Sequence, residues 1–280
     1  MTYNEIMSKI KVGLALGVGG ACGVAHLGFL QALEESGIKV DMIAGASMGA
    51  IIGGLYASGV SLEELESLSK SLTKGDIIEL NVFKILKEGL FTGKRLEKYL
   101  SEHLKCKNIE DTKIKFVAQA TDIKTGKIKV FEEGSMVDAL RASSAIPGIF
   151  TPVYKDNTCY IDGGAVEPVP FRILKERDMD VVIAVNCLSD YKDEQTPKNT
   201  FNILIDSMNL MIDNTWKNDK EKYKDYYDIY CFDGLEDVNP VSIDIESISR
   251  SIAYGKTMGF KYADEIKKII EEKKKNKCKN

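Results

Sequence analysis

One serine in this chain has the sequence surroundings that a catalytic nucleophile needs. Ser47 lies in Gly45-Ala46-Ser47-Met48-Gly49, between an apolar segment at 39–46 and another at 48–59. A nucleophilic serine must stand clear of a sheet on a tight strand-to-helix turn, and flanking glycines remove the Cβ atoms that would collide there. Such a serine attacks acyl esters. An ordinary turn in which Ser47 caps the helix fits the same five residues, so the pattern alone leaves both interpretations open.

A serine hydroxyl is a weak nucleophile until a base takes its proton, and the sequence restricts the choice of base. The chain contains two histidines, His26 and His103. In α/β-hydrolases the histidine follows the acid, which follows the serine, and no histidine follows residue 103. His103 lies in a polar segment and is expected at the surface. His26 follows a glycine-rich segment, where it could face the site, pack in the core or hydrogen-bond near a helix end.

Asp162 is the strongest remaining candidate for the base. It lies in Tyr160-Ile161-Asp162-Gly163-Gly164, at the end of an apolar segment, and sites of α/β proteins lie at the carboxyl edge of the sheet. Burial beside Ser47 would raise the pKa of Asp162 and make it a better proton acceptor. The alternative is a turn aspartate that bonds its own backbone. The shortage of histidines favours a Ser47–Asp162 dyad.

A glycine-rich segment, Gly17-Val18-Gly19-Gly20-Ala21-Cys22-Gly23, follows the first apolar segment. It is close to the dinucleotide-binding pattern, with Asp41 at about the right spacing for a ribose contact, although Cys22 takes the place of the third glycine. Alternatively the amides of Gly19, Gly20 and Ala21 form an oxyanion hole, in which the loss of one donor costs about 2.7–4 kcal/mol. An acyl-transfer site explains both the loop and the serine motif, whereas a cofactor loop explains only one.

The elements that must position these motifs alternate between strand and helix. Apolar strand signals at 11–18 and 39–46 each lead through a turn into a helix signal, at 24–37 and 48–59, which predicts an α/β fold with a mainly parallel sheet. Further strands are expected at 113–121, 127–132, 159–164 and 180–187, and amphipathic helices at 61–105 and 201–216. We expect one domain, with a catalytic core at 11–187 and a helical remainder at 188–280.

Composition excludes several classes of protein. A net charge of −4 argues against a nucleic-acid partner. The sequence has no signal peptide and no long uncharged apolar run, and its six cysteines form no CxxC pair, so we expect a cytoplasmic protein with reduced thiols. The tail 267–280 holds seven lysines and two glutamates. A solvated, frayed helix end is the simpler interpretation of this tail, and contact with anionic lipid at the inner membrane surface is the alternative.

In this order, the glycine loop, the serine motif and Asp162-Gly163-Gly164 resemble the patatin-like phospholipase family, particularly its small bacterial members. The resemblance covers roughly 11–187 and, more loosely, the chain to about 270. Further segments of the sequence also match family signatures, namely Ala120-Thr121-Asp122 with Thr125-Gly126, Ala142-Ser143-Ser144-Ala145-Ile146-Pro147, Phe150-Thr151-Pro152-Val153 and Pro168-Val169-Pro170. Together these segments are far more specific than any one motif.

The resemblance implies a three-layer α/β/α patatin-like fold and hydrolysis of lipid acyl esters, often phospholipid or lysophospholipid. It implies Ser47 as nucleophile, Asp162 as base and the amides of Gly19, Gly20 and Ala21 as oxyanion hole, with no metal or cofactor. The family loop usually carries Arg or Lys where this chain has Cys22. A weak or inactive member that binds lipid or a partner protein is therefore the alternative to a hydrolase. The family also usually has Asn at the position of Glu167.

Two amphipathic segments, 76–91 and 201–216, could border the acyl site. They could cover it as a lid or lean on a bilayer. The simpler interpretation is that they pack on the core, as most amphipathic helices do.

Overall fold

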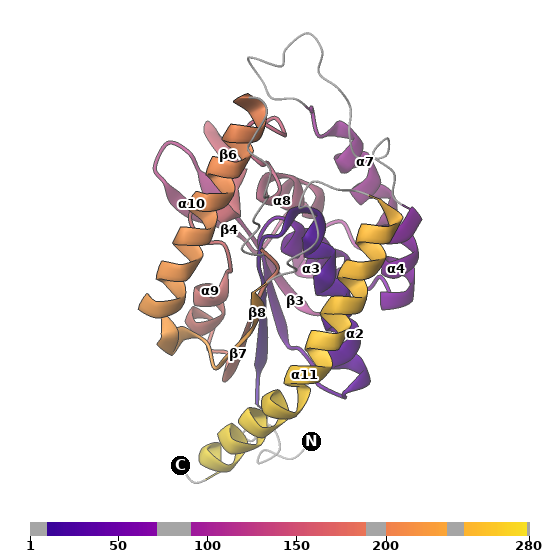
Figure 1. Ribbon diagram of the computed structural model, residues 1–280, viewed down its shortest axis with the longest axis vertical. Coiled ribbons are helices and arrows are strands. Elements are labelled where there is room, and N and C mark those ends of the chain that lie inside the picture. Colours follow the sequence, from indigo (N-terminus) through magenta and orange to yellow (C-terminus); the bar gives the residue numbers. More distant parts are fainter. Residues whose placement is uncertain (1–9, 72–90, 189–199, 234–243, 279–280) are drawn as a thin grey trace.

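The computed structural model describes residues 10–71, 91–188, 200–233 and 244–278, and within them one central sheet carries the whole architecture (Figure 1). Seven strands lie in the order β5-β6-β3-β2-β1-β7-β8, and β4 pairs with β3 outside this path. The strands are β1 (Val12–Leu16), β2 (Met42–Gly45), β3 (Lys115–Asp122), β4 (Lys127–Phe131), β5 (Val153–Lys155), β6 (Thr158–Asp162), β7 (Val181–Asn186) and β8 (Ile229–Asp233). The pairs among β3, β2, β1, β7 and β8 are parallel, and β4, β5 and β6 are antiparallel to their partners.

Helices cover both faces of this sheet. One face carries α2 (Ala25–Glu35), α3 (Met48–Ser58), α4 (Leu62–Ser71), α7 (Lys94–His103), α8 (Met136–Ser143) and α11 (Ile245–Lys277). The other carries α9 (Phe171–Glu176) and α10 (Thr200–Lys222) (Figure 1). Every residue of β1 and β7 is buried, as expected for parallel strands covered on both faces. The predicted three-layer α/β/α fold is confirmed.

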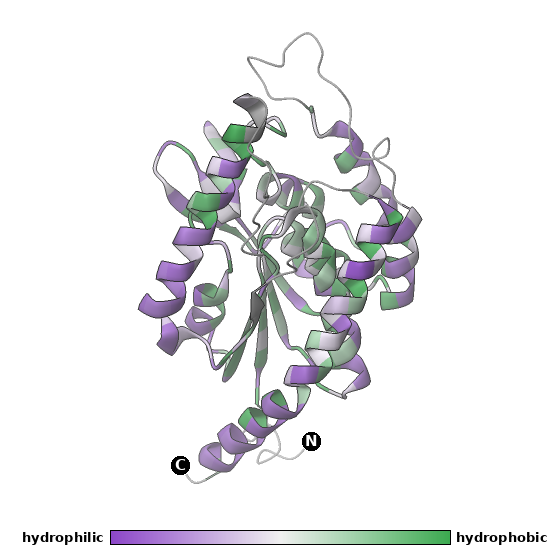
Figure 2. Cartoon of the chain, in the orientation of Figure 1, coloured by the Kyte–Doolittle hydropathy of each residue, from purple (hydrophilic) through white to green (hydrophobic). Residues whose placement is uncertain are grey.

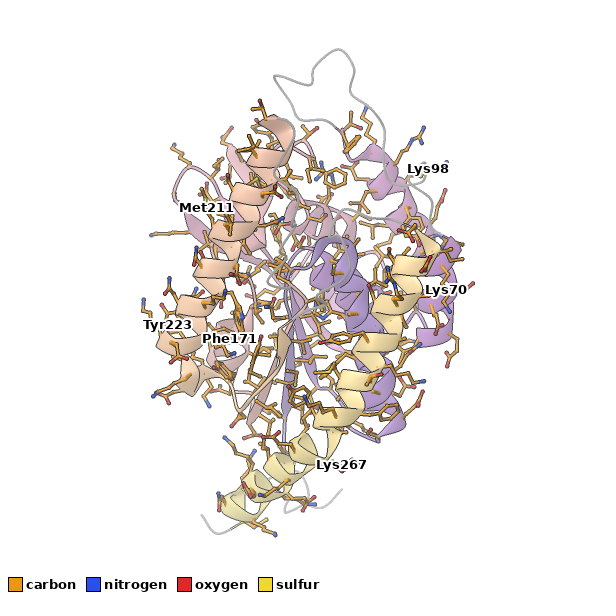
Figure 3. All side chains as sticks on the ribbon, in the orientation of Figure 1. Lys70, Lys98, Phe171, Met211, Tyr223 and Lys267 are labelled. Atoms are coloured by element: carbon orange, nitrogen blue, oxygen red, sulfur yellow. The ribbon has the colours of Figure 1, made fainter. Side chains whose placement is uncertain are left out.

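Two separate cores hold the layers together, and both are apolar where the helices face the sheet (Figure 2). The smaller core lies under α9 and α10, where Phe171 packs edge-on against Trp216 at 6.2 Å between ring centroids. Phe171 also packs against Tyr223 at 6.4 Å between ring centroids, and both residues are labelled in Figure 3. Trp216 is 1% exposed, so it anchors the middle of α10 to the sheet. The interpretation of 201–216 as a helix packed on the core therefore holds at Trp216.

The segment beyond residue 187 differs from the prediction. It was expected to be helical, but it also supplies β8, the edge strand beside β7. β5 was not predicted either, because at three residues it is too short to show a periodic pattern. Helix α11 packs along α2, with Gly255 against the carbonyl oxygen of Ala25. A Cβ at Gly255 would collide with that oxygen.

The lysine-rich tail is also more ordered than a frayed helix end, because α11 continues to Lys277. Lys273 pairs with Asp228 at 2.7 Å and Lys277 with Asp180 at 3.0 Å. This end of α11 lies at the opposite end of the molecule from the first turns of α10 (Figure 1). The segment 76–90 lies outside the described residues.

Candidate active site

Ser47 occupies a strained turn between β2 and α3. Its φ of 54° lies in the left-handed region, with ψ at −125°. A non-glycine residue adopts such a conformation only where its surroundings enforce it, and such residues gather at active sites. The Ser47 side chain makes no capping hydrogen bond to α3. The helix-cap interpretation of this serine is therefore wrong.

The two glycines of the motif permit this turn by close approach. A Cβ on Gly49 would collide with the carbonyl oxygen of Leu16 at the end of β1, and a Cβ on Gly45 would collide with the backbone of Ala50. The N–H of Ala46 also donates to the oxygen of Leu16 at 3.0 Å. These contacts press the start of α3 against β1, which leaves Ser47 at the carboxyl edge of the sheet.

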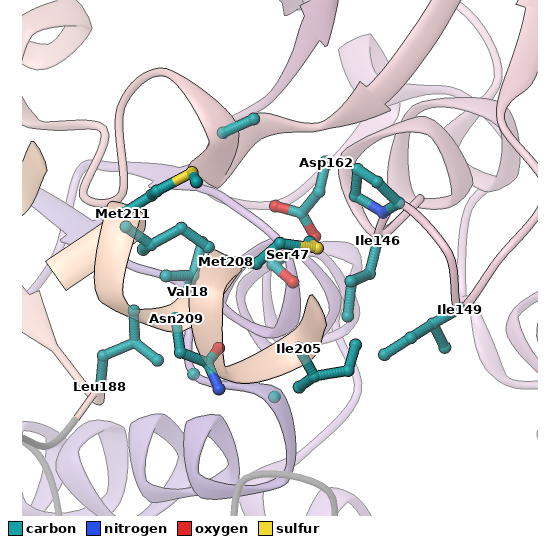
Figure 4. Close-up of a pocket in the computed structure, with 15 residues that line it drawn as sticks. Val18, Ser47, Ile146, Ile149, Asp162, Leu188, Ile205, Met208, Asn209 and Met211 are labelled. Atoms are coloured by element: carbon teal, nitrogen blue, oxygen red, sulfur yellow. The ribbon is translucent and has the colours of Figure 1, made fainter. Parts of the chain in front are cut away.

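Asp162 reaches the same edge from a strand of opposite direction. β6 runs antiparallel to β3, with Asp162 opposite Ala120, and Gly45 at the end of β2 lies opposite Ala118 of the same strand. The sheet register therefore sets Asp162 level with Ser47. The two side chains face one another in Figure 4.

The carboxyl group of Asp162 is buried, with the residue 6% exposed. Burial raises its pKa from 3.8 to about 6, and this effect outweighs hydrogen bonding from the Ser47 side chain and from the backbone of Gly164, both of which lower the pKa. Oδ1 accepts the N–H of Gly164 at 2.8 Å. The turn-aspartate interpretation is thus correct for one oxygen. Among the described residues, Oδ2 has no partner at full hydrogen-bonding geometry. Catalytic hydrogen bonds are often long in the absence of substrate and tighten when it binds.

The glycine loop lies beside this pair. Gly19 and Gly20 line the same pocket as Ser47 and Asp162, whereas Ala21 is buried and does not. Within the described residues the N–H groups of Gly19 and Gly20 have no acceptor. The loop becomes the 3-10 turn η1 (Gly20–Val24), so these amides lie at its amino end. The structure therefore brings together four of the five residues expected to act on the ester.

His26 holds the loop in place and is not aimed at Ser47. It is fully buried, with Nε2 at 2.8 Å from the carbonyl oxygen of Gly17 and Nδ1 at 3.4 Å from Sγ of Cys187. Burial lowers its pKa to about 4, so the ring is neutral near pH 7. Both ring nitrogens are engaged, which excludes His26 as the base. His103 ends α7, where its ring contacts Tyr99.

Cys22 belongs to the glycine loop, and its side chain is buried in the core. It is 1% exposed, and burial raises the pKa of its thiol to about 11. Cys22 is therefore a buried thiol of low reactivity rather than an activated one. Cys22 is absent from the pocket lining.

The pocket itself is apolar apart from the candidate groups and Asn209. Its volume is about 230 Å³. Three regions line it around Ser47 and Asp162, namely the loop with Val18, Gly19 and Gly20, the stretch after α8 with Ile146, Pro147 and Ile149, and helix α10 with Ile205, Met208, Asn209, Met211 and Ile212; Ala165 and Leu188 complete it (Figure 4). A lining of this kind suits a hydrocarbon chain. The first turns of α10 therefore form a pocket wall.

Asp41 does not belong to this site. It precedes β2 at the amino edge of the sheet, where Oδ2 accepts the N–H of Val12 at 2.9 Å. A ribose-binding acid would have to lie at the carboxyl edge, beside the glycine loop. The dinucleotide interpretation is wrong on this point. In the described ranges, no group of three His, Cys, Asp or Glu side chains could hold a metal ion.

Glu167 has a structural partner that the sequence did not reveal. Its carboxylate is buried and receives two hydrogen bonds from Arg172, each 3.0 Å long. Such a bidentate pair satisfies a buried charge. It accounts physically for a carboxylate where the family usually has an amide.

Comparisons with known proteins identify the family to which the chain belongs. The sequence profile of the patatin-like phospholipase family matches residues 14–175. The chain belongs to this family. It is 38% identical over 179 residues to an uncharacterised NTE family protein of Mycobacterium bovis, covering 64% of this chain and 49% of that protein. It is 30% identical over 279 residues to mouse patatin-like phospholipase domain-containing protein 6, covering 94% and 20%.

Another family member, lysophospholipase NTE1 of Candida albicans, is 30% identical over 71% of this chain and 14% of its own length. The chain thus spans about half the length of its mycobacterial relative and a fifth or less of the two eukaryotic ones. VipD from Legionella pneumophila superimposes with a TM-score of 0.50 at 15% identity, over 92% of this chain and 67% of that chain, which shows the shared fold. No helix in the described part of the chain is long and apolar enough to cross a membrane.

Proposed function

We propose that this protein is a serine hydrolase of lipid acyl esters, with Ser47 as nucleophile and Asp162 as base. The observation that carries the proposal is the strained Ser47 facing a buried carboxyl group of raised pKa inside an apolar pocket (Figure 4). The strained backbone of the serine, the raised pKa of the carboxyl group and the apolar pocket are separate observations, and a serine hydrolase of lipid esters accounts for all three. Membership of the patatin-like phospholipase family supports the same substrate class.

In the first half of the reaction Asp162 takes the hydroxyl proton of Ser47 while Oγ attacks the ester carbonyl carbon. The negative charge that develops on the carbonyl oxygen is stabilised by the N–H groups of Gly19 and Gly20. Collapse of the tetrahedral intermediate breaks the bond to the alcohol, which leaves with the proton from Asp162. The acyl chain remains on Ser47.

In the second half water attacks the acyl-enzyme and gives one proton to Asp162. The second tetrahedral intermediate collapses, the fatty acid leaves, and the proton returns to Oγ of Ser47. The raised pKa of Asp162 suits it to both steps, because a carboxyl group with a pKa of about 6 accepts and releases a proton near neutral pH.

The test is turnover of a short p-nitrophenyl ester and of lysophospholipid micelles by wild type, Ser47→Ala and Asp162→Asn. We expect turnover by wild type and a loss of at least about a thousandfold in each variant. Asp219→Asn is a matched control, because Asp219 is half-buried on α10 and absent from the pocket lining. Full activity of Asp162→Asn would exclude the dyad.

The second candidate is a patatin-like protein that binds lipid or a partner without turnover. The observation that favours it is Cys22, where the family usually has a cation. Labelling of Ser47 by a fluorophosphonate probe separates the two, since a dead site would not react. Cys22→Arg tests the residue directly, and a large gain of activity in that variant would support the second candidate.

We further propose that the first turns of α10 contact a lipid surface. Four large apolar side chains there are exposed, Ile203 at 52%, Leu204 at 48%, Leu210 at 63% and Met211 at 67%. Figure 2 shows this end of α10 as apolar and the other end as polar. Met211 also lines the pocket, so the exposed surface and the pocket meet at this helix. The lysine-rich tail lies at the other end of the molecule, as Lys267 and Met211 show in Figure 3.

A further inference from the structure

The end of helix α8 holds both residues of the proposed dyad through two hydrogen bonds. The hydroxyl oxygen of Ser143, the last residue of α8, accepts the backbone N–H of Ser47 at 3.1 Å. The carbonyl oxygen of Ala145, two residues on, accepts the backbone N–H of Asp162 at 3.0 Å. Ser47 and Asp162 come from elements that are distant in the sequence. The stretch from Ser143 to Ala145 therefore links them.

The Ser143 hydroxyl is well suited to hold the strained turn. Ser143 is 0% exposed and absent from the pocket lining, so it meets Ser47 from within the protein. The backbone at Ser47, with φ of 54°, persists only if its surroundings stabilise it. A buried N–H without an acceptor is unfavourable. In the observed conformation the hydroxyl oxygen of Ser143 is the acceptor for the N–H of Ser47.

Arg141 connects the end of α8 to two other segments of the protein. Its buried guanidinium donates through Nη2 to the carbonyl oxygen of Thr151 at 2.6 Å and to that of Thr92 at 3.2 Å. Its planar group also lies over the ring of Phe150, 5.4 Å from the centroid. These contacts fix the end of α8 next to Ser143, which makes Ser143 a firm support for the turn at Ser47.

We propose that Ser143 is a positioning residue, whose hydroxyl holds the backbone of Ser47 so that Oγ faces Asp162. The inference rests on the proposed hydrolase function and adds a residue to it that touches neither substrate nor the reacting atoms. Small displacements of a nucleophile reduce the rate of the chemical step strongly while leaving substrate binding alone. Loss of Ser143 should therefore lower kcat and leave KM unchanged.

The neighbouring serine provides a matched control. Ser144 is 4% exposed, and its hydroxyl donates to the carbonyl oxygen of Leu140 at 2.8 Å, within its own helix. We would measure kcat, KM and Tm for Ser143→Ala, Ser144→Ala and wild type. We expect kcat of Ser143→Ala to fall about tenfold or more at unchanged KM. We expect kcat of Ser144→Ala to change by less than about twofold.

Two further variants keep the test decisive. Ser143→Thr retains the hydroxyl and should restore most of kcat, whereas Ser143→Cys fills the same space with a weak acceptor and should show the loss even if Ser143→Ala does not fold. The proposal would be overturned if kcat of Ser143→Cys equalled that of wild type. It would also be overturned if both alanine variants lost kcat equally and in parallel with a fall in Tm. Ser47→Ala is measured alongside. Absence of turnover in wild type would overturn the hydrolase function itself and the role of Ser143 with it.

Discussion

At the scale of single residues, the acidity of Asp162 determines when the proposed enzyme works. A base must be ionised, and burial raises the pKa of this carboxyl group to about 6. We predict that kcat/KM is half-maximal near pH 6, rises to a plateau above it and falls about tenfold per pH unit below it. A pH profile on a non-ionising ester checks this. A profile that stays flat down to pH 4 would exclude Asp162 as the base.

The same pKa predicts a stability effect of opposite direction. Because the folded-state pKa of Asp162 lies above its unfolded value of 3.8, folding disfavours the ionised form, and stability falls as pH rises from about 4 through 6. A shift of this size is worth ~3 kcal/mol at most. Asp162→Asn should therefore raise the free energy of unfolding by ~1–3 kcal/mol near pH 8 and have little effect near pH 4. Urea denaturation at both pH values measures the difference, and an equal effect at both would contradict the assignment.

At the scale of elements, α10 is expected to set the acyl length. Ile212 lines the pocket, while Leu210 on the same helix points outward and is 63% exposed. We predict that Ile212→Trp reduces kcat/KM for a dodecanoyl ester about tenfold relative to a butyryl ester, because the larger ring shortens a pocket of about 230 Å³. Leu210→Trp is the control and should leave the ratio unchanged. An unchanged ratio in Ile212→Trp would show that the chain lies elsewhere.

The outer side of α10 carries the membrane prediction. Ile203→Glu combined with Leu210→Glu adds two negative charges to the exposed apolar surface without touching the pocket lining. We expect this variant to lose most of its flotation with anionic or neutral liposomes while keeping turnover of a soluble short ester. Thr257→Glu on α11 is a control on the other face of the sheet. Equal flotation of all three proteins would place the contact outside α10.

At the scale of the whole molecule, α11 packs against α2 and covers one face of the fold, although the family profile ends at residue 175. Gly255 lies against the backbone of Ala25, where an added methyl group has no room. We predict that Gly255→Ala lowers the free energy of unfolding by ~2 kcal/mol or more, since the two helices must separate. Thr257→Ala, on the exposed side of α11, should change it by less than ~0.5 kcal/mol. A thermal melt of both variants decides, and equal stability would show that α11 can shift without cost.

The sequence by itself predicted the α/β fold, and it singled out Ser47 and Asp162 as the residues of the proposed dyad. These follow from local chemistry, because a turn that exposes a serine needs glycines at fixed spacing and a chain with two histidines leaves few bases. It also indicated the glycine loop, whose first two amides line the pocket. Strands β5 and β8 escaped prediction, since short or edge strands carry little periodicity of their own.

Only the tertiary structure decided which polar groups meet. It showed that His26 bonds the loop, that Asp41 lies at the wrong edge of the sheet and that Cys22 is buried in the core. The hydroxyl of Ser143 reaches Ser47 across 96 positions of sequence. Such contacts depend on strand order and register, which arise from packing over the whole sheet and leave no periodic signal in any one segment.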